Sequence, residues 1–270
     1  MKRSLMFLSA AVLALSTAFI SSCSDDESGG GSKVPPAKIK TIAFNDGFAI
    51  ESWAFSYDDQ DRVTSISNVY DGGDPATITY TYDDAASELT IDKDGNETVY
   101  ALDTEGRVIK EYWNEDKTEW EGYQYNSDGR MIKIFEHYSG ADHLKYDLTV
   151  EDNNTTHRIR YEDDGTTVRE DREFTYTIGD NASGIHQIYA VDSEWKNIAG
   201  LYGKQSEKLV EAYVRHITEE PGTSYGATYA YTFDDKDRVA TQTKNGTSSG
   251  GTFTESWAYT YYEDGEQFLF

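Results

Sequence analysis

Large apolar and small polar residues alternate along much of the chain between residues 38 and 270. Residues 78–82 read Ile-Thr-Tyr-Thr-Tyr, and residues 53–57 and 229–233 place aromatic and small side chains in the same order. Successive side chains of a strand point to opposite faces, so this period of two predicts antiparallel strands with one buried face. With 21 Tyr residues and few aliphatic ones, the core should consist largely of aromatic cross-strand contacts.

A recurring polar turn joins these alternating runs. Residues 123–134 read Tyr-Gln-Tyr-Asn-Ser-Asp-Gly-Arg-Met-Ile-Lys-Ile. This order suits a type I turn followed by a left-handed residue, which makes Tyr125 face Met131 across the ladder. Gly accepts the left-handed conformation, and Asp tolerates it better than most residues. We predict a structural role for the left-handed residue and the following Arg in four turns: Asp61 and Arg62, Gly106 and Arg107, Gly129 and Arg130, Asp237 and Arg238.

The apolar residues before successive turns lie 20–25 residues apart, which corresponds to one hairpin per repeat. At this spacing the chain holds on the order of 16 to 20 strands. The predicted fold class is all-β: a long antiparallel meander of repeated hairpins that forms a single curled sheet or a partly closed barrel. Curling is expected because an open sheet of this length leaves unpaired edges.

Two segments bear on closure and on an exception to the strand pattern. Residues 51–57 nearly repeat at residues 255–261, so they are either two members of one repeat or the first and last repeats of a closed barrel. Trp195, Ile198 and Tyr202 have helical spacing, and Gly203 can end a helix. We predict one short helix near residues 194–203 that covers an open end or the interior of the sheet.

The N-terminal region has the order of a lipoprotein leader. Lys2 and Arg3 precede the apolar residues 5–20, and Cys23, the single cysteine, follows Ile-Ser-Ser. The apolar run is too short and wrongly flanked for a spanning helix. We therefore predict a signal peptide at residues 1–22, a lipidated Cys23, a flexible acidic Gly/Ser/Pro tether at 23–37 and a β-domain at 38–270. An ordinary secretory signal with a chance cysteine is the alternative.

Charge excludes one class of partner. The formal net charge is −25, and removing Lys2 and Arg3 with the leader makes it −27. Phosphate contacts need clustered basic residues, so no nucleic acid partner is expected. The predicted partners are the membrane, through the anchor at Cys23, and a glycan or a surface protein.

The chain resembles surface-exported lipoproteins of Bacteroidetes in its lipobox, its acidic cluster at residues 25–27 and its Gly/Ser spacer. The tyrosine-rich hairpins resemble the YD repeats of RHS-type proteins. Residues 38–270 resemble a family of uncharacterised Bacteroidetes lipoproteins with a porin-like β-domain, through residues 125–130, 199–204 and 233–238. This resemblance implies the fold and display on the outer face of the outer membrane, and it implies no known activity.

Few residues are candidates for chemistry. Asp92, Asp94 and Asn96 resemble the start of a calcium loop, although the Gly and Glu of an EF-hand are missing, so any calcium binding is weak and no other cofactor is expected. Trp113 and Trp120 flank an acidic loop and could stack on a sugar, or pack within the sheet. Residues 222–226 have the spacing of a nucleophile elbow, but no His follows them. The five histidines lack ligand spacing, so no metal site is assigned.

These observations predict a surface-anchored, non-catalytic lipoprotein that acts as a binding or structural module. A carbohydrate-binding accessory protein of nutrient uptake is the first alternative, and a hydrolytic enzyme and an outer-membrane pore are the others. Charged residues at many strand positions, such as Asp264 and Glu266, interrupt the apolar outer band that a membrane-spanning barrel requires.

Overall fold

The computed structural model describes residues 38–185 and 200–263, which contain sixteen β-strands and no helix. The strands, in chain order, are β1 (Ile39–Asn45), β2 (Ile50–Tyr57), β3 (Val63–Tyr70), β4 (Ala76–Asp83), β5 (Glu88–Lys93), β6 (Asn96–Leu102), β7 (Val108–Tyr112), β8 (Trp120–Tyr125), β9 (Met131–Tyr138), β10 (Ala141–Glu151), β11 (Asn154–Tyr161), β12 (Val168–Asp180), β13 (Lys208–Ile217), β14 (Ser224–Phe233), β15 (Val239–Ser248) and β16 (Gly251–Tyr261).

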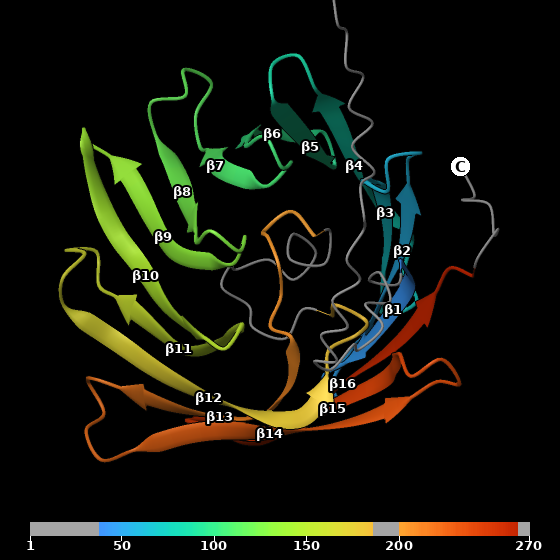
Figure 1. Ribbon diagram of the computed structural model, residues 1–270, viewed down its shortest axis with the longest axis vertical. Helices are drawn as coiled ribbons and strands as arrows, with labels where there is room; N and C mark the ends of the chain where they lie inside the picture. The colour runs from blue at the N-terminus through green and yellow to red at the C-terminus, as the bar shows by residue number, and fades with distance from the viewer. Residues whose placement is uncertain (1–37, 186–199, 264–270) are drawn as a thin grey trace, which may run out of the picture. The chain divides into compact units, whose positions relative to one another are not determined.

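The strands form an antiparallel meander that closes into a barrel. Each strand pairs with its neighbours in sequence, and β1 pairs with both β2 and β16 (Figure 1). The all-β meander predicted from the sequence is therefore confirmed. The curled sheet or partly closed barrel is wrong, because the ring of strands is complete.

Closure depends on the first strand. Ile42 of β1 lies opposite Trp53 on one side and Tyr259 on the other, and the ring of Phe44 lies 6.2 Å from that of Trp53 and 5.1 Å from that of Trp257. The nearly repeated segments 51–57 and 255–261 thus lie on either side of β1 in the closed barrel. Pairing on both sides of β1 removes the exposed edges that an open sheet would leave.

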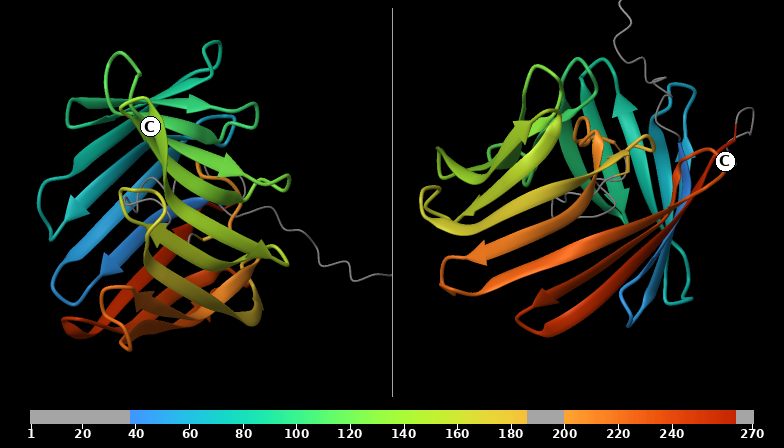
Figure 2. Two further views of the ribbon diagram at one scale, coloured as in Figure 1. Left: turned by 90° about the vertical axis from the view of Figure 1, so that its left-hand side faces the viewer. Right: turned by 60° about the horizontal axis from the view of Figure 1, so that its bottom comes forward.

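The two faces of the wall differ in composition. In β4, Ile78 and Tyr80 are buried while Thr77, Thr79 and Thr81 are exposed, and the aromatic face of the other strands is buried in the same way. The buried face is the interior of the barrel, and the strands run obliquely around its axis (Figure 2). The outer wall consists largely of Thr, Ser, Ala and charged residues.

The four repeated turns have the expected geometry. The left-handed residues have positive φ: 67° at Asp61, 78° at Gly106, 82° at Gly129 and 59° at Asp237. The facing pairs are those that the turn type predicts, namely Tyr57 with Val63, Leu102 with Val108, Tyr125 with Met131 and Phe233 with Val239. All four turns lie at the same end of the barrel, because each follows an even-numbered strand of the meander.

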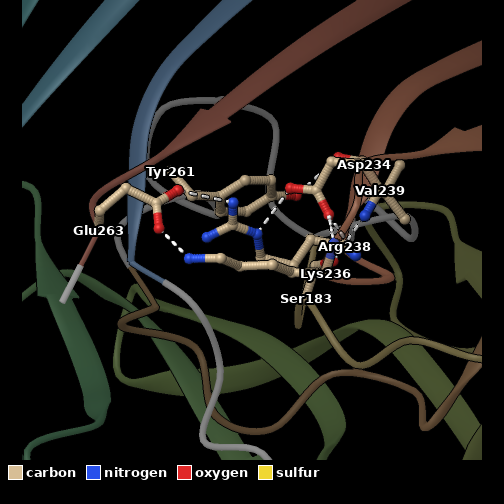
Figure 3. Close-up of polar contacts among 7 residues, drawn as sticks. All are labelled: Ser183, Asp234, Lys236, Arg238, Val239, Tyr261 and Glu263. Atoms are coloured by element: carbon tan, nitrogen blue, oxygen red, sulfur yellow. Dashed lines mark hydrogen bonds and ion pairs between the residues drawn. The ribbon is translucent and has the colours of Figure 1, made fainter.

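In three of the four turns the Arg joins two hairpins. In the turn shown in Figure 3, Asp234 accepts hydrogen bonds from the backbone N–H of Arg238 at 2.9 Å and from its Nε at 2.7 Å. The guanidinium lies 4.7 Å from the ring of Tyr261, whose hydroxyl donates to the carbonyl of Val239 at 2.8 Å. Burial raises the pKa of Tyr261 to about 12, so the hydroxyl remains a donor. The same arrangement occurs at Asp58, Arg62 and Tyr82 and at Asp103, Arg107 and Tyr125.

The described residues of the connection between β12 and β13 lie within the ring of strands (Figure 1). These residues, 181–185 and 200–207, are called the plug below. Leu201 accepts a hydrogen bond from the backbone N–H of Val108 at 2.9 Å, and Ser183 accepts one from that of Val239 at 2.8 Å. Tyr202 is almost fully buried, with its ring 4.9 Å from that of Tyr123.

The helix predicted near residues 194–203 falls largely outside the described residues. Its described part, residues 200–203, is a turn and not a helix. Gly203 has a φ of 78°, and a Cβ at this position would lie 2.4 Å from the carbonyl oxygen of Gly129. The close contact of the plug with the turn after β8 therefore explains the glycine better than the end of a helix does.

The predicted signal peptide at 1–22, the tether at 23–37 and the lipidation site Cys23 also lie outside the described residues. Within residues 38–185 and 200–263 no helical segment has the length and hydropathy needed to cross a membrane.

Candidate functional site

The barrel has two unlike ends. The plugged end carries the plug and the turns that follow β2, β6, β8 and β14; its inward side chains, such as Tyr57, Val63 and Val108, are apolar and buried. The charged end carries the turns after β1, β3, β5, β7, β9, β11, β13 and β15. Here the inward positions hold carboxylates, arginines and lysines. A candidate site is therefore the inner face of the charged end.

Three glutamates form an acidic row on this inner face. Glu121 lies directly opposite Glu111 on one side and Glu136 on the other. Lys145 bonds Glu121 at 2.8 Å and Glu136 at 2.9 Å, and the hydroxyl of Tyr123 donates to Glu121 at 2.5 Å. Burial would lower the pKa of Lys145, but these two carboxylates outweigh it and raise that pKa. Lys145 thus offsets the repulsion between carboxylates placed side by side in the register.

A basic row lies three strands further around the barrel. Arg158 of β11, Arg172 of β12 and Arg215 of β13 are consecutive partners in the register, so their side chains share the inner face. All three converge on Glu170: Arg158 at 3.1 Å, Arg172 at 2.9 Å and Arg215 at 2.6 Å.

Burial and charge compete at Glu170. Its side chain is only 4% exposed. Burial alone would raise its pKa, but the charges of Arg172, Arg158 and Arg215 outweigh burial and lower it. Glu170 therefore stays ionised at neutral pH. The pKa of Arg158 is lowered by its own burial and by the charge of Arg172.

Solvent reaches the charged end. The side chains of Arg172, Lys145 and Arg215 are 20%, 21% and 32% exposed although they face inward. The hairpins at this end also display apolar side chains to solvent. These rim residues are Phe48, Ile50, Tyr70, Trp113 and Val168. A molecule that approached this end would meet the rim residues first and the two charged rows behind them.

The two candidate stacking residues do not form one surface. Trp120 pairs with Tyr112 in the register and stacks on His137 at 4.8 Å, on the outer wall of the barrel. Trp113 follows Tyr112, so it belongs to the opposite face, and 45% of it is exposed. Trp113 is thus one of the rim residues, whereas Trp120 packs against its strand neighbours.

The candidate calcium residues belong to a tight hairpin turn. Lys93 pairs with Asn96, and Asp94 and Gly95 both have positive φ, as a two-residue turn requires. A carboxylate oxygen of Asp92 accepts the backbone N–H of Gly95 at 2.8 Å. The turn thus has a structural explanation that needs no ion.

A different set of residues has the spacing of a metal site. Within the described ranges, the one group of three His, Asp or Glu side chains with ligand atoms inside 4.8 Å of one another is His157, Asp171 and Glu173. They lie on the outer wall of β11 and β12. One imidazole with two carboxylates could hold a divalent transition metal. The set was missed because its members are neighbours only once the strand register is known.

The elbow-like segment opens an ordinary strand. Ser224 is the first residue of β14, and its hydroxyl lies 3.2 Å from Nδ1 of His216 on the neighbouring strand. Both residues are exposed on the outer wall. A nucleophile elbow needs a strand-to-helix turn beside an oxyanion hole, and β14 begins after a hairpin turn.

The basic row carried a sequence signal that we missed. Glu170 and Arg172 lie an even number of residues before Phe174 and Tyr176, so the period of two places all four on the buried face. Charged residues at positions that the alternation places in the core are candidates for a functional site.

Comparison with known proteins defines the fold. The sequence matches no model of a protein family and no curated protein. Among solved structures, the chain is similar to a porin-like protein from Bacteroides uniformis ATCC 8492, with a TM-score of 0.65, 14% identity and coverage of 84% of this chain and 99% of that chain. The fold is a porin-like β-barrel. A porin-like protein from Bacteroides vulgatus ATCC 8482 aligns with a TM-score of 0.49 and 8% identity over 83% of this chain and 99% of that chain. At 14% identity, the likeness to the Bacteroides uniformis protein shows the fold alone.

Proposed function

We propose that the chain is a surface-anchored, non-catalytic binding protein whose ligand contacts the inner face of the charged end. One observation carries the proposal: a single barrel interior is filled by apolar side chains and the plug at one end and lined by ionised side chains at the other. Ionised groups on an inner face cost stability relative to apolar ones. Their concentration at the solvent-reached end supports a binding role.

The carboxylates of the charged end are held in ion pairs, so we assign them no catalytic role. Glu170 is bound by three arginines, and Glu121 and Glu136 share Lys145. Carboxylates in such ion pairs suit recognition of a ligand better than proton transfer to it. A hydrolytic enzyme is the alternative, and hydrolysis of a substrate by the purified chain would support it.

The proposed location is the outer face of the outer membrane, with a lipid at Cys23 and the barrel outside the bilayer. The outer wall carries Thr, Ser and charged residues, whereas a membrane-spanning barrel has an apolar outer band. This difference, with the filled interior at the plugged end, argues against the alternative of a pore. Replacing Cys23 with Ser should move the protein from the membrane fraction to the soluble fraction. Retention in membranes would contradict the anchor.

A carbohydrate ligand is the second candidate. Aromatic side chains exposed at a rim can stack on sugar rings, and Phe48, Tyr70 and Trp113 are 96%, 61% and 45% exposed. Carboxylates behind them can accept hydrogen bonds from sugar hydroxyls. The proposed role is then that of an accessory protein of nutrient uptake.

The test is binding of the mature chain carrying Cys23→Ser to a glycan array, with and without calcium. We expect at least one glycan class to bind, and Trp113→Ala to weaken that binding. Phe233→Ala is the matched control, because Phe233 is 49% exposed but lies at the plugged end. Absence of binding to every glycan would remove the carbohydrate candidate. Equal loss with Phe233→Ala would contradict the assignment to the charged end.

A further inference from the structure

The basic row brings several arginines to one carboxylate. Three guanidinium groups converge on one carboxylate, and the side chains of Arg158 and Glu170 are 9% and 4% exposed. The guanidinium of Arg160 also lies beside this row, 5.8 Å from the ring of Tyr146. Among the described residues of a chain of net charge −25, arginines thus outnumber carboxylates at this largely buried position.

Hydrogen-bonding capacity shows the same imbalance. A guanidinium offers five N–H donors, and an ionised carboxylate accepts about four hydrogen bonds. Arg172 and Arg215 alone therefore offer more donors than Glu170 can accept. Nε of Arg172 is buried and makes no hydrogen bond. A buried donor without a partner costs stability that a bound acceptor restores.

Aromatic rings hold the arginines in place. The guanidinium of Arg172 lies 4.6 Å from the ring centre of Tyr213, and that of Arg158 lies 5.2 Å from that of Tyr146. Stacking on a ring fixes the plane of a guanidinium, which suits its paired N–H groups to a planar or tetrahedral oxyanion. The row is thus positioned before any ligand arrives.

The position of the row relates it to the charged end. Arg215 is 32% exposed and pairs in the register with Tyr225, near the hairpin after β13. The hydroxyl of Tyr225 donates to Glu220, a carboxylate in the hairpin turn after β13. The acidic row lies on β7–β9, with β10 between the two rows. A ligand that spans both rows would place its anionic part on β11–β13 and its hydrogen-bond donors on β7–β9.

We propose that Arg172 and Arg215 bind an oxyanion of the ligand, a carboxylate or a sulfate carried by a saccharide. This inference rests on the proposed function and names the chemistry of its ligand. The oxyanion accepts the N–H groups that Glu170 leaves unused. The hydroxyl groups of the same saccharide donate to Glu121 and Glu136.

The test uses the mature chain carrying Cys23→Ser and isothermal titration with three probes: a galacturonate oligosaccharide, a sulfated disaccharide and a neutral oligosaccharide of matched length. We expect one of the two anionic probes to bind and the neutral probe to bind at least about tenfold more weakly, as loss of a charged hydrogen-bond set implies. The stronger of the two anionic probes identifies the oxyanion.

Two variants and a control locate the site. Arg172→Gln and Arg215→Gln should each weaken binding of the anionic probe about tenfold or more. Arg169→Gln is the matched control, because Arg169 makes the same charge change at a half-exposed position beside Glu162. It should leave the dissociation constant within about twofold. Equal weakening by all three variants would overturn the assignment to the basic row.

A further variant guards against misfolding. Glu170→Gln keeps the three arginines and removes their competing anion, so a folded variant should bind the anionic probe more tightly than the parent. Unchanged or weaker binding by this variant would contradict the inference. Binding of neutral glycans alone on the array would leave the proposed function intact and refute the oxyanion. Failure of both glycans and anionic probes would refute the oxyanion and the carbohydrate candidate together.

Discussion

The two ends of the barrel are built from the same strands in different ways. At the plugged end, three hairpins repeat one arrangement, in which an Asp binds the Arg of its own turn and that Arg lies over the Tyr of the following hairpin. At the charged end the hairpins differ in length, and the acidic and basic rows each occur once. Repeated contacts thus hold one end together and leave the other end free to differ in its chemistry.

Among the four turns with the repeated sequence, the turn after β8 departs from this arrangement. Asn126 stands where the other turns have Asp, and it accepts the backbone N–H of Arg130 at 2.9 Å. The guanidinium of Arg130 instead reaches Glu207 of the plug at 3.1 Å. A single change from Asp to Asn therefore accompanies the use of a turn arginine to hold the plug.

The largest expected effect comes from removing the plug's buried ring. Tyr202→Ala should lower the free energy of unfolding by about 4 kcal/mol, because it empties a fully buried aromatic position. Equilibrium unfolding in urea measures this loss. Tyr70→Ala, at a rim position that is 61% exposed, should change the same quantity by less than about 0.5 kcal/mol. Similar losses in the two variants would mean that the plug does not stabilise the barrel.

The second effect concerns the charge at the centre of the basic row. Glu170→Gln should cost about 3 kcal/mol at pH 7, because it leaves largely buried arginines without their counter-charge. The folded-state pKa of Glu170 is lowered, so its contribution is present above its unfolded pKa of about 4.3 and is lost as the pH falls below that value. Urea unfolding at pH 7 and in acid should therefore show a cost that shrinks in acid.

The matched control for this charge is Glu162→Gln in the hairpin turn after β11, where Glu162 lies 3.8 Å from Arg169. We expect a cost near zero at either pH, as for most exposed ion pairs. A cost for Glu170→Gln that is the same at both pH values would show that the loss comes from packing and not from charge.

A third effect, smaller still, tests the repeated unit. Asp103→Ala removes hydrogen bonds from the backbone N–H of Arg107 at 2.9 Å and from its Nε at 2.7 Å. We expect a loss of about 1.5 kcal/mol in the free energy of unfolding. Asp116→Ala, in an exposed loop at the charged end, is the control and should cost less than about 0.5 kcal/mol. If the two losses were equal, the turn contacts would not distinguish the ends.

The sequence predicts the plugged end far better than the charged end. Alternation and turn chemistry are local, so the facing pairs such as Tyr125 with Met131 follow from a few adjacent residues. Closure is one of two interpretations of the near-identical segments 51–57 and 255–261, and nothing in the sequence indicates that β1 lies between them.

The charged rows depend on register over long distances in sequence. The pairing of β11, β12 and β13 brings Arg158 and Arg215 to one carboxylate. A long connection separates β12 from β13 in the sequence, so local sequence patterns do not predict that pairing. The sequence carried one usable signal: Glu170 lies an even number of residues before Phe174, so the alternation places both side chains on the same face. Helical spacing misled at residues 200–203, where contacts with the barrel interior override the preference of an isolated segment.

The smallest expected effect isolates the contact between Arg130 and the plug. Glu207→Gln should cost about 1 kcal/mol, because Arg130 is buried but Glu207 is 58% exposed. Asn126→Asp restores the carboxylate of the other turns and should draw the guanidinium of Arg130 back to its own hairpin. In that background Glu207→Gln should cost about 0.5 kcal/mol less than in the parent chain, a coupling that a double-mutant cycle in urea can measure. If the losses of free energy from Asn126→Asp and Glu207→Gln were strictly additive, the turn and the plug would not compete for the guanidinium of Arg130. The turn after β8 would then be no exception to the repeat.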